Sequence, residues 1–572
     1  MHDLVIRGGL LVDGSGGPAL VGDLAIDGDR IVAVGGDVGS GRRELDARDR
    51  VVAPGWVDIH THYDGQVMWD PLLSPSSRHG VSTVIMGHCG VGFAPVREQH
   101  RELMVRVMEG LEDIPGDTLR AGLRWNWQSF PEYLDVLEQM PRAVDVGTQV
   151  PHSALRLYAM GDRGAKRDPA SAEDIAQLAQ VLEQSLCAGA LGFSSSRSRI
   201  HTTSDGHHIP GSFADADELL GIGRAMARAG HGVFEFFSDM DVPEREFEWM
   251  TRLSRECRVP VHFIVAQLDR SRKYRELLER TAQAVAEGAD ISALVACRPV
   301  GMLMTLESEY HPFSHHPSYL AIAGLPLPMR LRILRDAVFK AKLLAETSTN
   351  KHGFWRARMQ QFDGMFQLGD PPDYEPEPSR SIAAIAAREG RAPLDVVYDL
   401  LLENHGEEVI YFPFFSYMDG NFDVLEEMLN HPASLVSLAD GGAHCGIMCD
   451  AGAPTFLLSH WVRDRSRGPR LPLEQAVHKQ TARNANAYGL RDRGLLAPGY
   501  KADVNVIDLE RLQLETPYWV RDLPADGRRL VQYARGYAAS VVSGVVTVLD
   551  DEHTGALPGK LVRGPQRAPV GR

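Results

Sequence analysis

The apolar residues of the chain follow two different periods, one at the ends and one in the middle. At the ends, short runs alternate between apolar and polar positions and are separated by glycine-rich turns, as in β-strands, where successive side chains face opposite ways. These runs begin at Leu4, Leu10, Leu24, Arg30 and Val51, and similar runs return at 503–508 and 538–549. We therefore expect residues 1–53 and 495–572 to form one small β-sandwich from discontinuous sequence.

The middle of the chain alternates short apolar runs with helical patterns. Residues 172–188 and 214–229 carry apolar side chains at three- and four-residue spacing, which is typical of amphipathic helices. Strands that alternate with helices favour a parallel sheet with crossover helices. The strand candidates are residues 56–62, 82–89, 144–151, 190–195, 232–237, 261–267, 291–297 and 435–440. We therefore predict an α/β fold, a closed (β/α)8 barrel of the TIM type over residues 54–494, with its chemistry at the carboxyl ends of the strands.

One interval departs from this alternation. Residues 301–405 follow the seventh strand candidate and are too long for a βα loop, so we expect an inserted subdomain. Because the loops after barrel strands surround the active site, this insertion is expected to act as a lid. An oligomer contact is the alternative. Its proline-rich piece, residues 368–378, is expected to be an extended loop.

Composition narrows the possible partners and the compartment. The net charge of −16 argues against a nucleic-acid partner, which would favour a basic face. No uncharged apolar run reaches about 18 residues, so no membrane span is expected. The N-terminus lacks a basic segment before an apolar core, so no signal peptide is expected. Six cysteines without framework spacing indicate reduced thiols and a cytoplasmic location. The sequence leaves open whether the protein forms a homo-oligomer.

A histidine pair ends the first apolar strand of the predicted barrel. Residues 51–64 read VVAPGWVDIHTHYD. Because residues two apart on a strand point to the same side, His60 and His62 project together. Two neighbouring imidazoles are what a shared divalent ion needs, and imidazole suits zinc. Such pairs also occur by chance as core residues, so the position at a strand end carries the prediction.

These motifs resemble the amidohydrolase superfamily of metal-dependent hydrolases. Residues 494–508, GLLAPGYKADVNVID, resemble its C-terminal return segment, and residues 3–14 resemble its opening strands. Residues 84–95, VIMGHCGVGFAP, and 437–444, SLADGGAH, are similar to the N-acyl-D-amino-acid deacylase (D-aminoacylase) branch. The resemblance covers most of the chain and is weakest between residues 301 and 405.

The resemblance implies roles for two further strand-end residues. Cys89 matches a cysteine that binds metal in the D-aminoacylase branch; by itself it would read as a small buried residue. Asp440 matches an aspartate that binds the metal and takes a proton from metal-activated water. By itself it would read as a turn residue before Gly441 and Gly442. Histidine plus thiolate favours zinc over magnesium or calcium.

The fifth and sixth strand candidates depart from the D-aminoacylase pattern. That branch places one histidine at the end of each strand, completing a second metal position, but residues 232–240 contain no histidine. Glu235 is a weak candidate ligand there. His262 begins the sixth strand and is expected to be a core residue, whereas Gln267 ends it and is expected to face the substrate. We therefore expect one or two zinc ions, and favour one held by His60, His62 and Asp440, with or without Cys89.

Substrate contacts are predicted from strand-end position. Residues 192–199, GFSSSRSR, resemble a Gly-Phe-Ser-Ser segment of the family. An arginine near a strand end can clamp a carboxylate bidentately, although a single arginine is more often a structural ion-pair partner. The predicted substrate-binding residues are Ser195, Arg197, Gln267, Arg298 and His444.

Three functions are compatible with these residues. The first is a zinc-dependent hydrolase of the C–N bond of an N-acyl amino acid or related amide, with Asp440 as proton shuttle. The second keeps the site but opens a cyclic amide or a lactone. The third is a non-catalytic barrel kept as a binding or scaffold protein. His60, His62, Cys89 and Asp440 together favour a catalytic protein, and the first function is the leading one.

Overall fold

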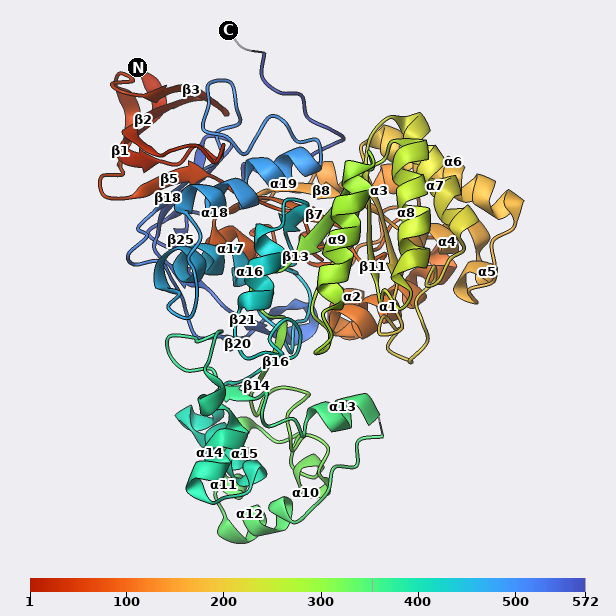
Figure 1. The fold of residues 1–572 in the computed structure, drawn as a ribbon, viewed down its shortest axis with the longest axis vertical. Helices are drawn as coiled ribbons and strands as arrows, with labels where there is room; N and C mark the ends of the chain where they lie inside the picture. Colours follow the sequence, from red (N-terminus) through yellow and green to blue (C-terminus); the bar gives the residue numbers. More distant parts are fainter. Residues whose placement is uncertain (352, 571–572) are drawn as a thin grey trace.

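The computed structural model describes residues 1–351 and 353–570 and shows a mixed α/β fold (Figure 1). Each of the eight expected segments of the middle region contains a strand, although most strands are shorter than expected. They are β6 (Trp56–Asp58), β7 (Val81–Met86), β8 (Asp145–Thr148) with β9 (Val150–Pro151), β10 (Gly192–Arg197), β11 (Val233–Ser238), β12 (Val261–Ile264), β13 (Ile291–Val295) and β17 (Ser434–Val436).

These strands pair in parallel and in chain order. One sheet has the order β6-β7-β8 and a second the order β9-β10-β11-β12-β13-β17. Only Gln149 separates β8 from β9. Beyond the ends of β6 and β17, the His62 amide donates to the Gly441 carbonyl at 2.8 Å, and the Asp440 amide donates to the His60 carbonyl at 3.2 Å. The segments that follow the first and last strands therefore lie side by side.

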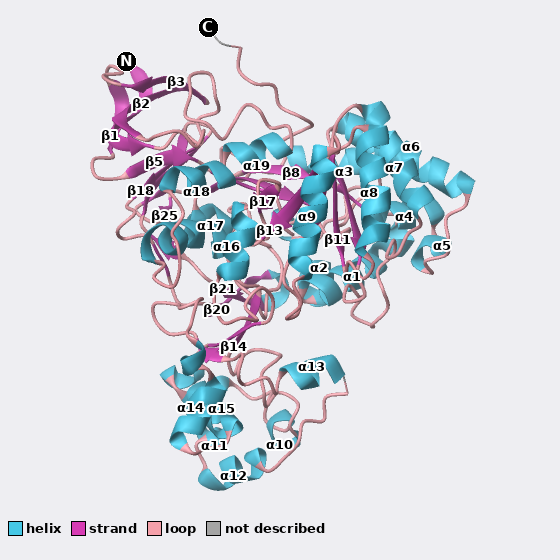
Figure 2. Cartoon of the chain, in the orientation of Figure 1, coloured by secondary structure: helices cyan, strands magenta, loops and turns pink. Residues whose placement is uncertain are grey.

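Helices lie outside these strands and cover them (Figure 2). The expected helix over residues 172–188 is α6, which begins at a capping box between Ser171 and Asp174, where each side chain satisfies a free backbone amide of the other. The helices of this region are α1 (Arg101–Glu112), α2 (Gly116–Gly122), α3 (Phe130–Glu138), α4 (His152–Met160), α5 (Asp162–Ala165), α6 (Ala172–Ala188), α7 (Ala216–Ala229), α8 (Pro243–Cys257), α9 (Lys273–Ala286), α16 (Asp423–Asn430), α17 (Ala453–Phe456), α18 (Leu473–Gln480) and α19 (Ala482–Ala487).

The two ends of the chain share one nine-stranded sheet, in which β5 pairs with β1 on one side and with β18 on the other. The runs at Leu4 and Leu10, expected as two strands, are one strand with a register shift between Ile6 and Gly9. The sheet contains β1 (His2–Leu11), β2 (Leu20–Asp27), β3 (Arg30–Gly35), β4 (Gly41–Asp46), β5 (Val51–Pro54), β18 (Val504–Ile507), β23 (Tyr537–Val542), β24 (Val545–Leu549) and β25 (Glu552–His553). Strand β4 was not expected, because its sequence, GRRELD, has one apolar residue. Two short pairs lie outside this sheet, β19 (Gln513–Leu514) with β22 (Ala534–Arg535) and β20 (Tyr518–Leu523) with β21 (Gly527–Val531).

The segment after β13 forms a separate lobe, at the bottom of Figure 1. Strands β14 (Gly301–Met304) and β16 (Ile410–Pro413) pair at its base, with β15 (Phe366–Gln367) beside β16. Its helices are α10 (Pro317–Leu320), α11 (Leu327–Leu334), α12 (Ala337–Leu344), α13 (Gly353–Arg358), α14 (Ile382–Glu389) and α15 (Pro393–Leu402). The lobe has its own hydrophobic core, against which Ile447 and Met448 pack. These two residues belong to the loop that begins at Asp440.

The proline-rich piece is irregular, as expected, but it is anchored. Tyr374 and Glu375 are buried, and the Arg298 guanidinium lies 4.3 Å from the centre of the Tyr374 ring. The Glu375 carboxylate lies 2.8 Å from Nε2 of His460. The middle of this loop is therefore anchored in the packed interior, whereas residues 370–371 and 377–378 are exposed.

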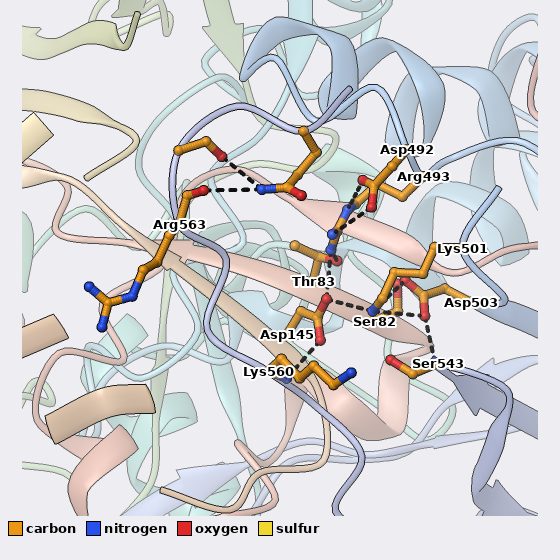
Figure 3. A network of polar contacts seen from close by, with 12 residues as sticks. Ser82, Thr83, Asp145, Asp492, Arg493, Lys501, Asp503, Ser543, Lys560 and Arg563 are labelled. Atoms are coloured by element: carbon orange, nitrogen blue, oxygen red, sulfur yellow. Dashed lines mark hydrogen bonds and ion pairs between the residues drawn. The ribbon is translucent and has the colours of Figure 1, made fainter. Parts of the chain in front are cut away.

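A buried ion network joins β8 to the C-terminal segment (Figure 3). The Asp145 carboxylate accepts hydrogen bonds from Arg493 at 2.8 Å and from Lys501 at 2.5 Å. Arg493 also donates to Thr83 and Asp492. Burial by itself would raise the pKa of Asp145, but Lys501 and Arg493 outweigh it and lower this pKa to about 2. The network thus fixes the C-terminal return segment against the parallel strands.

No helix of the described residues has the length and apolar character needed to span a membrane.

Candidate metal centre

The two histidines of the His-x-His motif point their Nε2 atoms at one carboxylate. Both follow β6 and are buried. Nε2 of His60 lies 3.4 Å from Oδ1 of Asp440, and Nε2 of His62 lies 3.7 Å from the same oxygen. The backbone bonds between the segments after β6 and β17 hold these three residues together.

Cys89 adds a sulfur to this group. It follows β7 in a left-handed backbone conformation with φ of 53°, and its Sγ lies 3.6 Å from Nε2 of His60. The donor atoms of His60, His62 and Cys89 all lie within 4.8 Å of one another. Burial, with Glu235 and Glu112 nearby, raises the pKa of the Cys89 thiol well above its ordinary value. A thiolate here therefore needs a cation beside it.

The separations between these donor atoms fit a zinc ion. Zn–N bonds of about 2.0–2.1 Å and Zn–S bonds of about 2.3 Å in tetrahedral geometry put neighbouring ligand atoms about 3.3–3.6 Å apart. Three of the separations agree: Nε2 of His60 lies 3.4 Å from Oδ1 of Asp440 and 3.6 Å from Sγ of Cys89, and Nε2 of His62 lies 3.7 Å from Oδ1 of Asp440. The buried Oδ1 of Asp440 accepts no hydrogen bond from any described residue, as expected of an atom reserved for a ligand.

Glu235, a weak candidate ligand from the sequence, lies behind His60 and not in front of it. Its Oε1 is 3.7 Å from Nδ1 of His60, and its Oε2 is 3.5 Å from Nδ1 of His88. The ring of His88 stacks on that of His60 with centroids 4.3 Å apart. His60, His88 and Glu235 form a second group with metal-ligand spacing. His88 was not predicted as a site residue, although its place beside Cys89, just after β7, was a usable signal.

Glu112, the last residue of α1, was also missed. Its Oε1 lies 3.2 Å from Nδ1 of His62, and its Oε2 lies 3.9 Å from Nε2 of His444. Burial raises the pKa of Glu112 to about 8. Burial by itself would lower the pKa of His62, but Glu112 and Asp440 outweigh it and raise this pKa to about 9.

The predicted substrate residues have different surroundings. Ser195 contacts Nδ1 of His152 at 2.8 Å, and Arg197 holds Glu246 through two hydrogen bonds at 2.8 and 3.1 Å. Gln267 donates to Asp419 at 3.3 Å, and Arg298 donates to Asp450 at 2.8 Å.

Among the predicted substrate residues, His444 approaches the candidate metal ligands: its Nε2 lies 3.9 Å from Glu112, whose other oxygen faces His62. Both arginines already have a carboxylate partner inside the protein.

His262 lies at the opposite ends of the strands. Its ring meets that of Tyr488 with centroids 5.5 Å apart, and burial lowers its pKa to about 3. Both residues line a hollow of about 820 Å³, together with Val259, Pro260 and Gly489. This hollow opens beside the beginning of β12, away from the residues that follow the strand ends, and His262 is buried as expected.

Comparisons with known proteins agree with the motifs. The amidohydrolase family model matches residues 43–548. The N-acyl-D-aspartate deacylase of Alcaligenes xylosoxydans xylosoxydans is 28% identical over 98% of this chain and 95% of its own. The D-aminoacylase of the same organism is 28% identical over 88% of each chain. The structure of N-acyl-D-glutamate deacylase from Bordetella bronchiseptica, complexed with zinc and a phosphonate inhibitor, aligns with a TM-score of 0.64 and 22% identity over 98% of this chain and 100% of that one.

The family match spans most of the chain, so this protein belongs to the amidohydrolase family. Its relatives place it more narrowly in the D-aminoacylase branch of that superfamily, as the motifs at residues 84–95 and 437–444 predicted.

Proposed function

We propose that this protein is a zinc-dependent hydrolase of the C–N amide bond of N-acyl amino acids. The observation that carries the proposal is the group of His60, His62, Cys89 and Asp440, in which three donor–donor separations have the length expected at a zinc site. The D-aminoacylase and N-acyl-D-aspartate deacylase relatives support an N-acyl-D-amino acid as substrate.

We further propose that the parallel strands form one (β/α)8 barrel over residues 54–494, supported by the bonds that join the segments after β6 and β17.

The residues present can divide the reaction between them. When bound, zinc supplies a Lewis acid that polarises the carbonyl and lowers the pKa of water. His60, His62 and Cys89 would hold the ion, and Asp440 would bind beside them. Among the described residues, Asp440 is the carboxylate that faces both Nε2 atoms, so it would take the proton from the attacking water. The same carboxylate would then deliver that proton to the leaving amine nitrogen.

The purified protein is expected to hold about one equivalent of tightly bound zinc, because one group of donors matches a tetrahedral site. The check is elemental analysis of protein that has passed a gel-filtration column in buffer containing a chelator, which removes loosely bound metal. Two ions held equally tightly would instead assign His88 and Glu235 to a second site. A protein that took up no zinc on reconstitution would favour the binding or scaffold role. A panel of N-acyl-D, N-acyl-L, cyclic amide and lactone substrates then tests the bond that is cleaved.

We also propose that the lobe over residues 301–405 selects the acyl group. The loop that begins at Asp440 continues to Ile447 and Met448, which pack on the core of the lobe. The Leu303 amide donates to the Ile447 carbonyl at 2.8 Å. The base of the lobe and the catalytic loop are therefore bonded together.

All six cysteines are unpaired, which supports the proposed cytoplasmic location.

Substitution of Met448 by alanine should change the preference between short and long acyl groups by about tenfold or more, since one methylene in an apolar pocket discriminates on that scale. The measurement is the ratio of kcat/KM for two acyl chain lengths. Met329→Ala is the matched control, because Met329 is 53% exposed on the lobe. An unchanged ratio in Met448→Ala would remove the lobe from substrate selection.

A further inference from the structure

Glu112 is a buried carboxylate in an unfavourable place. It is fully buried, and neither of its oxygens accepts a hydrogen bond from any described residue. It is also the last residue of α1, where the helix dipole disfavours negative charge. Burying a carboxylate without a full set of partners costs stability. The contacts of Glu112 therefore offer the best explanation for a buried carboxylate at this position.

What it contacts is the outer nitrogen of a candidate metal ligand. His62 turns its Nε2 to Asp440 and its Nδ1 to Glu112, at 3.7 and 3.2 Å. Histidine ligands commonly donate their second N–H to a carboxylate, which fixes the tautomer and the ring orientation and makes the ligating nitrogen more basic. The separation of 3.2 Å is of hydrogen-bond length, although the two groups are not aligned for a hydrogen bond in this structure.

We propose that Glu112 is a positioning residue that accepts the Nδ1–H of His62 and so presents Nε2 to the metal. This inference rests on the proposed zinc site. Glu235 occupies the corresponding place behind His60, 3.7 Å from its Nδ1. Each histidine of the pair therefore has a buried carboxylate at its back.

The end of α1 also contacts the loop that carries Asp440. The Glu112 carbonyl accepts from the His444 amide at 2.5 Å, and the Asp113 carboxylate accepts from the Gly446 amide at 2.8 Å. Oε2 of Glu112 faces Nε2 of His444 at 3.9 Å. Glu112 thus lies between the segment after the first strand and the loop after the last one. The backbone of Glu112 fixes the loop after the last strand, and its side chain orients His62 in the segment after the first strand.

The test is the zinc affinity of Glu112→Gln, which keeps the size of the side chain and removes its charge. Loss of such an outer partner typically weakens metal binding by about 10–100-fold. Competition with a chromophoric chelator gives the zinc Kd of the full-length protein, and circular dichroism reports its folding. Glu375→Gln is the matched control, because Glu375 is also a buried carboxylate beside a histidine, His460, and among the described residues its side chain contacts Phe422, His460 and Arg465, which are not candidate ligands. Its zinc Kd should equal that of the wild type.

The outcomes separate the inference from the function. Wild-type zinc binding with an unchanged Kd in Glu112→Gln overturns the role of Glu112 and leaves the zinc hydrolase standing. A wild type that binds no zinc overturns both. Should Glu112→Gln fail to fold, Glu112→Asp keeps the charge but shortens its reach. A zinc Kd for Glu112→Asp equal to that of the wild type would then also count against the proposal, and a Kd weakened by severalfold would support it.

Discussion

Replacement of Asp440 by asparagine should lower turnover by about 10²–10⁴-fold, the usual contribution of general acid–base catalysis. The asparagine keeps the size of the side chain and one oxygen toward the two Nε2 atoms, but it cannot take a proton. Steady-state kinetics on an N-acyl-D-amino acid measures the loss. KM is expected to change less than kcat, because the proton transfer is made in the transition state.

Zinc content separates the two roles of Asp440. If the aspartate acts mainly as a base, Asp440→Asn should retain most of its zinc while losing turnover. Asp336→Asn is a suitable control, because Asp336 caps α12 in the lobe and has no contact with the metal group in the described structure. Near-wild-type turnover in Asp440→Asn would overturn the assignment of the proton shuttle.

The second large effect is expected for Arg493→Met. This buried guanidinium holds Asp145 and Asp492, and its loss leaves buried carboxylates short of positive charge. Removing one partner from a buried ion pair costs about 3–5 kcal/mol, so the free energy of unfolding should fall by about that amount. Urea unfolding followed by fluorescence measures it. A change below about 1 kcal/mol would show that the network contributes no more than a surface pair.

Two further measurements test this network. A surface ion pair serves as the control substitution, and acid unfolding reports the pKa of Asp145. Arg42→Met removes a partner of Asp3 in a pair that is 68% and 48% exposed, and it should cost about 1 kcal/mol or less. The lowered pKa of Asp145 adds stability that is fully present above its ordinary pKa of 3.8 and is lost as the pH falls toward about 2. Arg493→Met should raise this pKa and therefore move acid unfolding to higher pH.

The strand-end residues were predictable because parallel strands in chain order fix where their carboxyl ends meet. His60, His62, Cys89 and Asp440 each follow a short apolar run, and the structure brings them together as that rule requires. Glu112 gave no such signal. It ends an amphipathic helix about 50 residues from the histidines, where a charged side chain in sequence usually marks a solvent-facing position.

The contacts of a long side chain are harder to predict from sequence than the place of its backbone. Arg197 ends β10 as expected, yet its length lets it reach Glu246 on α8, and sequence position does not specify that choice. In the terminal sheet, the runs at Leu4 and Leu10 merged into one strand because Gly8, with φ of 65°, bends the strand without ending it. The polar edge strand β4 is held by backbone pairing with β1, which leaves no apolar pattern to detect.

Because β5 pairs with β18, the sheet shared by the two ends of the chain can be completed only after most of the chain has been synthesised. Strand β5 is buried along its whole length, and its outer edge pairs with β18, roughly 450 residues later in the chain. Bacterial and eukaryotic ribosomes add about 5–20 residues per second, so during synthesis this apolar edge stays unpaired for some tens of seconds. An unpaired edge strand is a template for aggregation. Production of the protein should therefore depend on holding chaperones, and chains truncated before residue 504 should accumulate as insoluble material.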